Sequence, residues 1–259
     1  LVEVRGPNGD ATWEQALSEI SAALAKSAEG QDGSAIGVIA SAQLASEELF
    51  LIREIFRDHL AARVGVSVPE EPGSCDDFLI KSDKNPNTFG ATLLGLAGGE
   101  APDAGLLVDE ALAGKLDVLW VFGHDIVKLF GEEKVQRISE QVPLVVFSGT
   151  NENPTVPFAD WVLPSAAYVE KDGTFVNCHG RVQRIVRAFP PLEGSREDWR
   201  ILLDLAARLG LSLDGQGPED IFERLAATVA AFESMSYETI GADGASVATA
   251  GSAAGEAAP

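Results

Sequence analysis

Residues 116–151 read LDVLWVFGHDIVKLFGEEKVQRISEQVPLVVFSGTN and contain two apolar runs separated by a helical pattern. The first run is Leu116–Gly123 and the second is Pro143–Ser148. Between them, from Asp125 to Ser139, apolar residues recur at the spacing of an amphipathic helix. Continuous apolar runs are typical of parallel strands that are buried on both faces of a sheet. The stretch therefore predicts a strand, a crossover helix and a second parallel strand.

The same alternation occurs earlier in the chain. Ala35–Ala40 is another apolar run, and the helical pattern after it extends from Ser46 to about Arg63. A helix is also predicted over Asp103–Lys115, directly before the quoted stretch. Strands that alternate with helices form doubly wound, mostly parallel sheets that are flanked by helices. The sequence therefore predicts an α/β fold of this kind.

Other elements follow from the same patterns. Helices are predicted over Trp13–Ala28, from the cap Ser195 to about Leu209 and over Pro218–Phe232, and short strands over Val66–Val68, Cys75–Asp83 and Val182–Ala188. The last two helices give the fold a C-terminal helical part. Residues 242–259 are mostly Ala, Gly and Ser, and such a segment buries too little apolar surface to offset its ordering entropy. We therefore predict one α/β region over residues 1–241 and a disordered tail over residues 242–259.

The composition excludes several classes of protein. A formal net charge of −21 argues against a nucleic-acid partner, which needs a basic face, and against adhesion to anionic lipid. The apolar runs are far shorter than the ~20 residues that span a bilayer, so no direct membrane insertion is expected. Cys75 and Cys178 are the two cysteines, too few for the usual iron–sulfur site, and this low content suits a reducing cytoplasm. The start lacks both a signal-peptide pattern and a Met, which predicts a fragment or a processed product.

Polar residues and glycines follow the predicted strands. They are Ser41, Gly123–His124–Asp125 and Ser148–Gly149–Thr150–Asn151. In a doubly wound sheet, ligands bind in the crevice outside the carboxyl ends of the strands, so these residues are candidate binding positions. No Walker motif is present and no G-x-G-x-x-G follows a strand, so nucleotide binding of those two types is not expected.

Three short groups could carry chemistry, and each has a structural alternative. His124–Asp125 could be a base with its orienting carboxylate, or a solvated helix start. Cys178–His179 could belong to a metal site, although successive residues of an extended chain point to opposite faces. Glu170–Lys171–Asp172 is a charge run, and such runs usually form solvated turns. No hydrolase signature of the G-x-S-x-G type occurs.

The segment Phe158–Gln183, FADWVLPSAAYVEKDGTFVNCHGRVQ, is rich in turn signals and is either a surface hairpin or a ligand loop. From Ala159 onward it resembles the signature of the molybdopterin oxidoreductase superfamily, A-D-x-V-L-P-x-A-x-x-x-E-K-x-G-T-x-x-N-x-E-G-R-x-Q. One departure is His179, where the family usually has Glu. Within the superfamily, the chain is similar to the C-terminal, molybdopterin-oxidoreductase-like region of the large iron–sulfur subunit of NADH–quinone oxidoreductase (respiratory complex I).

This resemblance implies the fold of formate dehydrogenase and DMSO reductase domains. It implies a scaffold in the peripheral arm of complex I, on the cytoplasmic, inner face of the cell membrane, that packs against other peripheral-arm subunits. The scaffold would have no catalysis of its own and no cofactor in this fragment. The iron–sulfur clusters that pass electrons from NADH to quinone would lie upstream, in the rest of the large iron–sulfur subunit.

The resemblance also allows an alternative, a fragment of an active molybdopterin-dependent oxidoreductase such as formate dehydrogenase with a bound pterin dinucleotide. The pterin-site positions, vestigial in the complex I subunit, correspond here to Ser148, Gly149, Thr150, Asn151, Glu170, Lys171, Gly173, Thr174, Asn177, Arg181 and Gln183. The loop Gly149–Asn151 and the Asn-rich loop Lys84–Ala91 favour the enzyme, whereas His179 weakens this alternative. A free-standing α/β domain that binds a small molecule is a third alternative.

Overall fold

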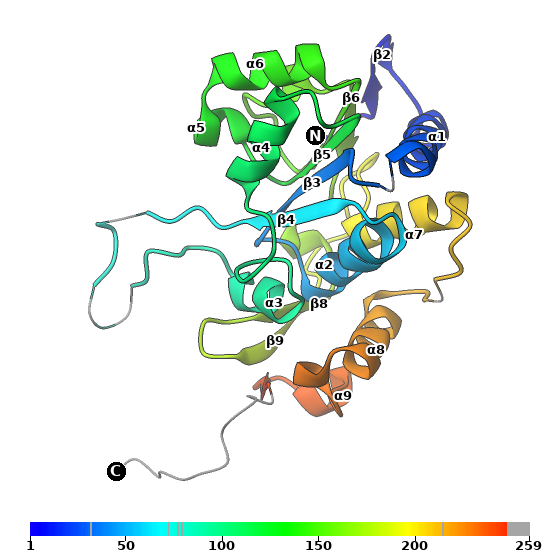
Figure 1. The fold of residues 1–259 in the computed structure, drawn as a ribbon. Helices are drawn as coiled ribbons and strands as arrows, with labels where there is room; N and C mark the ends of the chain where they lie inside the picture. Colours follow the sequence, from blue (N-terminus) through cyan, green and yellow to red (C-terminus); the bar gives the residue numbers. More distant parts are fainter. Residues whose placement is uncertain (32, 72, 77, 79, 214, 248–259) are drawn as a thin grey trace.

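The computed structural model describes residues 1–31, 33–71, 73–76, 78, 80–213 and 215–247. Within these residues a seven-stranded sheet has the order β2-β1-β7-β6-β5-β3-β4 (Figure 1). The strands are β1 (Arg5–Gly6), β2 (Gly9–Asp10), β3 (Ile36–Ser41), β4 (Arg63–Ser67), β5 (Val118–Phe122), β6 (Leu144–Gly149) and β7 (Trp161–Pro164). Strands β3 to β7 are parallel, and the β1–β2 hairpin adds to β7 in the antiparallel direction. The predicted mostly parallel sheet is therefore confirmed.

Helices cover both faces of this sheet (Figure 1). One face carries α1 (Trp13–Gln31), α2 (Ser46–Ile52) and α7 (Asp198–Arg208), and the other carries α4 (Ala104–Leu112), α5 (Ile126–Phe130) and α6 (Glu132–Gln141). Strand β5 shows why the apolar run is continuous. Trp120 and Phe122 pack into the core on the first face, whereas Leu119 and Val121 pack into the core on the other face. Successive side chains of a strand alternate between faces, so a strand covered on both sides needs apolar residues throughout.

Three predicted helices differ in their extent. The helix predicted from Asp125 to Ser139 is divided into α5 and α6 at Gly131, whose φ of 90° cannot continue a right-handed helix. The helix predicted from Ser46 to about Arg63 ends at His59, after α2 and a π-helical segment (Arg53–His59). Strand β4 then begins at Arg63, earlier than the predicted Val66. The helix predicted over Pro218–Phe232 consists of α8 (Pro218–Thr228) and a 3₁₀ turn (Ala230–Phe232).

The prediction of a strand over Cys75–Asp83 is wrong for the described part of this segment. The Asp76 carboxylate accepts hydrogen bonds from the backbone N–H groups of Phe78 and Ile80, at 3.0 and 2.8 Å. An Asp side chain that takes backbone donors in this way folds a turn in place of a strand ladder. An isolated bridge between Glu70 and Asp83 closes the loop.

A second, antiparallel sheet carries the segment that bears the signature. Its strands are β8 (Gly173–Val176), β9 (Arg181–Ile185) and β10 (Ala245–Ser246). Strand β9 ends before the predicted Ala188, because the backbone N–H of Arg187 donates to the Asp172 carboxylate at 3.0 Å. The sheet packs against α2, α3 (Thr88–Leu93) and α9 (Tyr237–Ile240), and α8 packs on α2.

The C-terminal end is ordered further than predicted. Strand β10 pairs with β9, and the backbone N–H of Val247 donates to the Gly180 carbonyl at 2.9 Å. The Val247 side chain is buried in the main core. The prediction of a disordered tail from Ala242 is therefore wrong for residues 245–247, because one apolar side chain and an open strand edge hold them. Residues 248–259 of that predicted tail lie outside the described residues.

Candidate functional site

The strand order changes direction at β3. Strand β4 follows β3 in the chain and lies on one side of it, whereas β5 lies on the other side. The loops that leave β3 and β5 therefore separate, and a crevice opens outside the carboxyl ends of the strands. Its volume is about 520 Å³, within the range of about 300–1,000 Å³ that is usual for small-molecule sites.

The crevice brings together residues from neighbouring strand ends. The predicted positions Ser41, Gly123 and Ser148–Asn151 all line it. They meet because the carboxyl ends of parallel strands lie at one edge of the sheet. The other lining residues are Gln43, Leu44, Lys84, Pro86, Ser165, Ala166, Ala167, Tyr168, Lys171, Phe175 and Asp198.

Most of this second group was not predicted. Residues 165–168 follow β7, which lies parallel to β6. If Trp161–Leu163 is interpreted as a further parallel strand, the strand-end rule selects residues 165–168 as well. Phe175 and Asp198 come from β8 and α7, and no local pattern connects them to the crevice.

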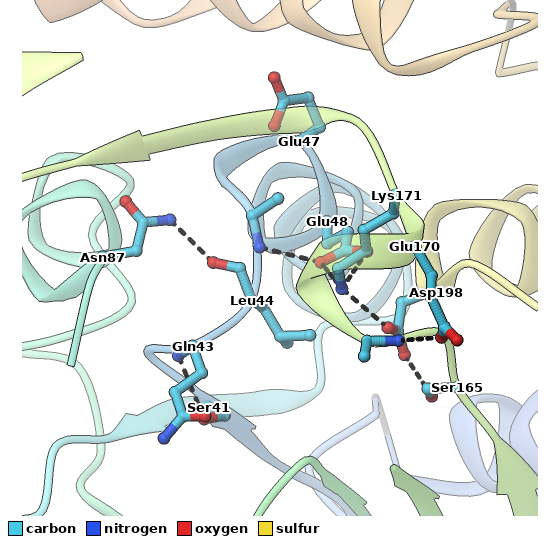
Figure 2. A network of polar contacts seen from close by, with 12 residues as sticks. Ser41, Gln43, Leu44, Glu47, Glu48, Asn87, Ser165, Glu170, Lys171 and Asp198 are labelled. Carbon is cyan, nitrogen blue, oxygen red and sulfur yellow. Dashed lines mark hydrogen bonds and ion pairs between the residues drawn. The ribbon is translucent and has the colours of Figure 1, made fainter. Parts of the chain in front are cut away.

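A buried ion cluster forms one wall of the crevice (Figure 2). The Lys171 ammonium donates to both oxygens of Glu48 at 2.8 Å and to Asp198 Oδ2 at 3.2 Å. Asp198 Oδ1 accepts a hydrogen bond from the Ser165 hydroxyl at 2.7 Å. Lys171 is 4% exposed, so the interpretation of its charge run as a solvated turn is wrong for this residue. The cluster ties the start of α2 and the start of α7 to the turn before β8.

Burial and neighbouring charges shift the pKa values of this cluster in opposite directions. Burial alone would lower the pKa of Lys171, but the carboxylates of Glu48 and Asp198 raise it above its ordinary value. Burial raises the pKa of Glu48 to about 6, against the lowering effect of Lys171. The Lys171 ammonium therefore stays charged at neutral pH and holds two carboxylates that are only 1% and 4% exposed.

Glu47 and Asn87 hold the free edge of β8. The Glu47 carboxylate accepts the backbone N–H of Thr174 at 2.8 Å and the hydroxyl of Tyr237 at 2.9 Å. Burial raises the pKa of Glu47 to about 7. Asn87 Oδ1 accepts the backbone N–H of Val176 at 2.8 Å. These side chains take the place of a neighbouring strand, so the edge of β8 is covered. Figure 2 shows Glu47 and Asn87 on either side of the loop that leaves β3.

The other signature residues bond to groups of this chain within the hairpin or next to it. The Glu170 carboxylate accepts the backbone N–H of Ala167, and Asn177 Oδ1 accepts the backbone N–H groups of His179 and Arg181. The Arg181 guanidinium donates to the carbonyls of Asp243 and Gly244. The Gln183 side-chain oxygen accepts from the Asn177 amide. Gly173 has no room for a side chain, since a Cβ there would lie 2.9 Å from the Cβ of Ala45. Of the predicted positions between 170 and 183, all of which the structure describes, Lys171 lines the crevice and the others do not.

The residue pairs considered for catalysis or metal binding lie outside the crevice lining. His124 Nε2 is 3.1 Å from the Ser67 carbonyl, and burial lowers the pKa of His124. Asp125 caps α5 and accepts the Thr155 hydroxyl at 3.0 Å, so the pair lies at a helix start, but His124 is buried and the predicted solvation is wrong for it. Cys178 is an exposed free thiol. In the part of the chain that the structure describes, no group of three or more His, Cys, Asp and Glu side chains could hold a metal ion, and no helix has the length and apolar character of a membrane span.

Comparisons with known proteins point to one family. Residues 81–208 match the molybdopterin oxidoreductase family. The chain is 34% identical over 128 residues to "Putative formate dehydrogenase YrhE" of Bacillus subtilis (strain 168). The aligned region covers 49% of this chain and 13% of that protein. It is 30% identical over 166 residues to "Putative formate dehydrogenase SAUSA300_2258" of Staphylococcus aureus (strain USA300). This alignment covers 64% of this chain and 16% of that protein. Acetylene hydratase from Pelobacter acetylenicus aligns with a TM-score of 0.43 and 16% identity, over 52% of this chain and 19% of the other.

The chain thus spans only 13% to 16% of the length of these curated relatives. Their names indicate formate dehydrogenases, so the assignment to complex I stays a prediction. The matched range contains the ends of β5, β6 and β7 and the whole of the β8–β9 hairpin. Over residues 81–208 the chain is therefore similar in sequence to the molybdopterin oxidoreductase family.

Proposed function

We propose that this chain is part of a molybdopterin-dependent oxidoreductase of the formate dehydrogenase type, and that its crevice holds the nucleotide end of a pterin dinucleotide. The observation that carries the proposal is the position of the crevice. It lies where the strand order reverses, and most of its lining residues belong to the segment that matches the family. The relatives that are named formate dehydrogenases support the reaction class.

The side chains around the crevice suit a nucleotide. Gln43 and Asn151 offer amide groups, and Lys84 offers the N–H of its ammonium group that remains beside its bonds to the Ser74 and Lys81 carbonyls. Tyr168 and Phe175 place aromatic rings in the wall, and such rings stack on bases. When bound, a molybdopterin supplies the redox-active metal centre, whereas these residues would bind and orient its nucleotide.

Replacing Asn151 or Tyr168 by alanine is expected to weaken nucleotide binding about tenfold, or ~1.4 kcal/mol, through loss of a hydrogen bond or of ring stacking. The measurement is calorimetric titration of the purified chain with guanosine, cytidine and adenosine diphosphates. Gln136→Ala, at an exposed position on α6, is the matched control and should bind like the wild type. If none of the three nucleotides binds at millimolar concentration, the crevice is not a nucleotide site.

We also propose a second candidate, a cofactor-free scaffold in the peripheral arm of complex I at the inner face of the cell membrane. Its support is that Glu170, Asn177 and Arg181 of the signature bond to backbone groups of this chain. On this alternative the chain packs against other peripheral-arm subunits. Pterin fluorescence of a denatured, oxidised sample, with elemental analysis for molybdenum and tungsten, separates the candidates. Near-stoichiometric pterin excludes the scaffold, whereas pterin-free protein that co-purifies with those subunits favours it.

A further inference from the structure

A groove outside the crevice lies beside the start of α7. It has a volume of about 820 Å³. Three arginines line it, Arg187, Arg196 and Arg200, together with the carboxylates of Glu197 and Asp204. We call it the arginine groove. It shares none of its described lining residues with the crevice.

The arginines of this groove are only partly engaged. Glu197 is 8% exposed and is shared by Arg200 at 3.2 Å and Arg187 at 4.0 Å. Arg196 pairs with Asp204 at 2.9 Å. The three arginine side chains remain 36% to 56% exposed. Because a guanidinium group has five N–H donors, each arginine keeps donors for a further acceptor.

The segment 186–192 borders the groove and exposes large apolar side chains. Val186, Phe189 and Leu192 are 68%, 64% and 58% exposed. The backbone N–H of Phe189 donates to the Val169 carbonyl at 3.2 Å, which fixes the segment against the turn before β8. Three large exposed apolar side chains within seven residues, beside a polar groove, suit an interaction site.

The charge of this surface differs from that of the chain as a whole. The chain has 40 Asp and Glu against 19 Lys and Arg. The lining of the groove carries three arginines against the two carboxylates of Glu197 and Asp204, so it has an excess of positive charge. An acidic protein segment is attracted to such a surface and is repelled elsewhere on the chain, which sets its position. An anionic membrane is a poorer partner, because its extended surface also meets the acidic remainder.

We propose that the arginine groove and the segment 186–192 bind an acidic segment of a partner protein that carries apolar side chains. The partner's carboxylates accept hydrogen bonds from Arg196 and Arg200, whose planar groups can each hold a carboxylate through two bonds. Its apolar side chains cover Phe189 and Leu192. Clusters of arginine that bind acidic motifs are a recurrent mode of peptide recognition. The proposal goes beyond the proposed cofactor site and does not depend on it.

The test uses the whole chain and a fluorophore-labelled synthetic peptide in which glutamate alternates with leucine and phenylalanine. Fluorescence anisotropy should show binding that weakens as salt is added. Phe189→Ser and Arg200→Gln are each expected to reduce the affinity about fivefold or more. Phe78→Ser, at a residue that is 91% exposed, and Arg137→Gln, at an exposed position on α6, are the matched controls and should leave the affinity unchanged. Thermal unfolding of each variant shows that the fold is intact.

Each result of the peptide and vesicle experiments either supports or overturns the proposal. Loss of affinity in the two groove variants alone supports the proposal. Equal binding by the wild type and the groove variants, or no binding at low salt, overturns it. Vesicles of phosphatidylcholine and phosphatidylglycerol are the second probe. If the chain binds these vesicles and not the peptide, the surface is a lipid site and the proposal is wrong. Neither outcome bears on nucleotide binding in the crevice.

Discussion

Replacing Lys171 by methionine is expected to lower the free energy of unfolding by about 3–5 kcal/mol. The substitution removes the cation that lies between Glu48 and Asp198, whose side chains are 1% and 4% exposed. A buried carboxylate without its partner is far less stable than the same group in water, since neither solvent nor a counter-ion screens it. Urea unfolding at neutral pH, followed by circular dichroism, measures the change.

The control is Lys128→Met, at an exposed lysine on α5, which should stay within about 0.5 kcal/mol of the wild type. Adding Glu48→Gln to Lys171→Met removes one of the two stranded charges, so the double variant should recover part of the loss. If Lys171→Met is as stable as the wild type, the cluster makes no net contribution to the stability of the fold.

Glu47 is expected to make the protein less stable as the pH rises. Burial raises its pKa in the folded protein from the ordinary value of 4.5 to about 7, so the folded chain binds this proton more tightly than the unfolded chain does. Where the folded state binds more protons, the free energy of unfolding falls with increasing pH. The contribution is complete below about pH 4.5 and is lost as the pH rises through about 7. The shift corresponds to about 3 kcal/mol.

Glu47→Gln isolates this effect. Its amide oxygen can still accept the Thr174 N–H, but the side chain does not ionise. Between about pH 5 and pH 8, the stability of the variant relative to the wild type should therefore rise by roughly 3 kcal/mol. Urea unfolding across this pH range measures it. Glu238→Gln, at an exposed position on α9, is the matched control and should follow the wild-type profile. Parallel profiles for Glu47→Gln and the wild type would show that the pKa of Glu47 is not raised.

Both predictions concern the same piece of structure. Lys171 and Glu47 fix the β8–β9 hairpin to α2, and the turn before β8 forms part of the crevice wall. The backbone of this wall is thus held in place by buried charged side chains. We therefore expect variants that loosen the hairpin to weaken nucleotide binding together with stability, whereas Asn151→Ala should affect binding alone.

Local patterns were sufficient for the central strands of the sheet and for part of its crevice. Leu116–Gly123 and Pro143–Ser148 form β5 and β6, because a strand buried on both faces must be apolar throughout. The strand-end rule then selected Ser41, Gly123 and Ser148–Asn151, all of which line the crevice.

Local patterns failed where one residue or a distant partner changes the outcome. Gly131 breaks a helix whose apolar spacing is otherwise continuous. Asp76 folds a turn where the sequence suggested a strand, and Val247 is ordered because β9 offers it an edge and a core. The effects of Gly131 and Asp76 are local but oppose the apolar spacing, whereas the order at Val247 depends on a strand that is distant in the sequence.

The buried charges show most clearly what local sequence patterns cannot predict. In the sequence, Glu47 and Glu48 are acidic residues at a helix start, and Lys171 belongs to a charged turn. In the structure, 123 positions separate Glu48 from Lys171, yet their charged groups are 2.8 Å apart. Apolar periodicity is a local property, so the sequence alone predicted the central parallel strands and the edge of the sheet at which the crevice opens. The partners of a buried charge depend on which elements pack together, so only the folded chain could show that the signature lysine supports the crevice wall from within.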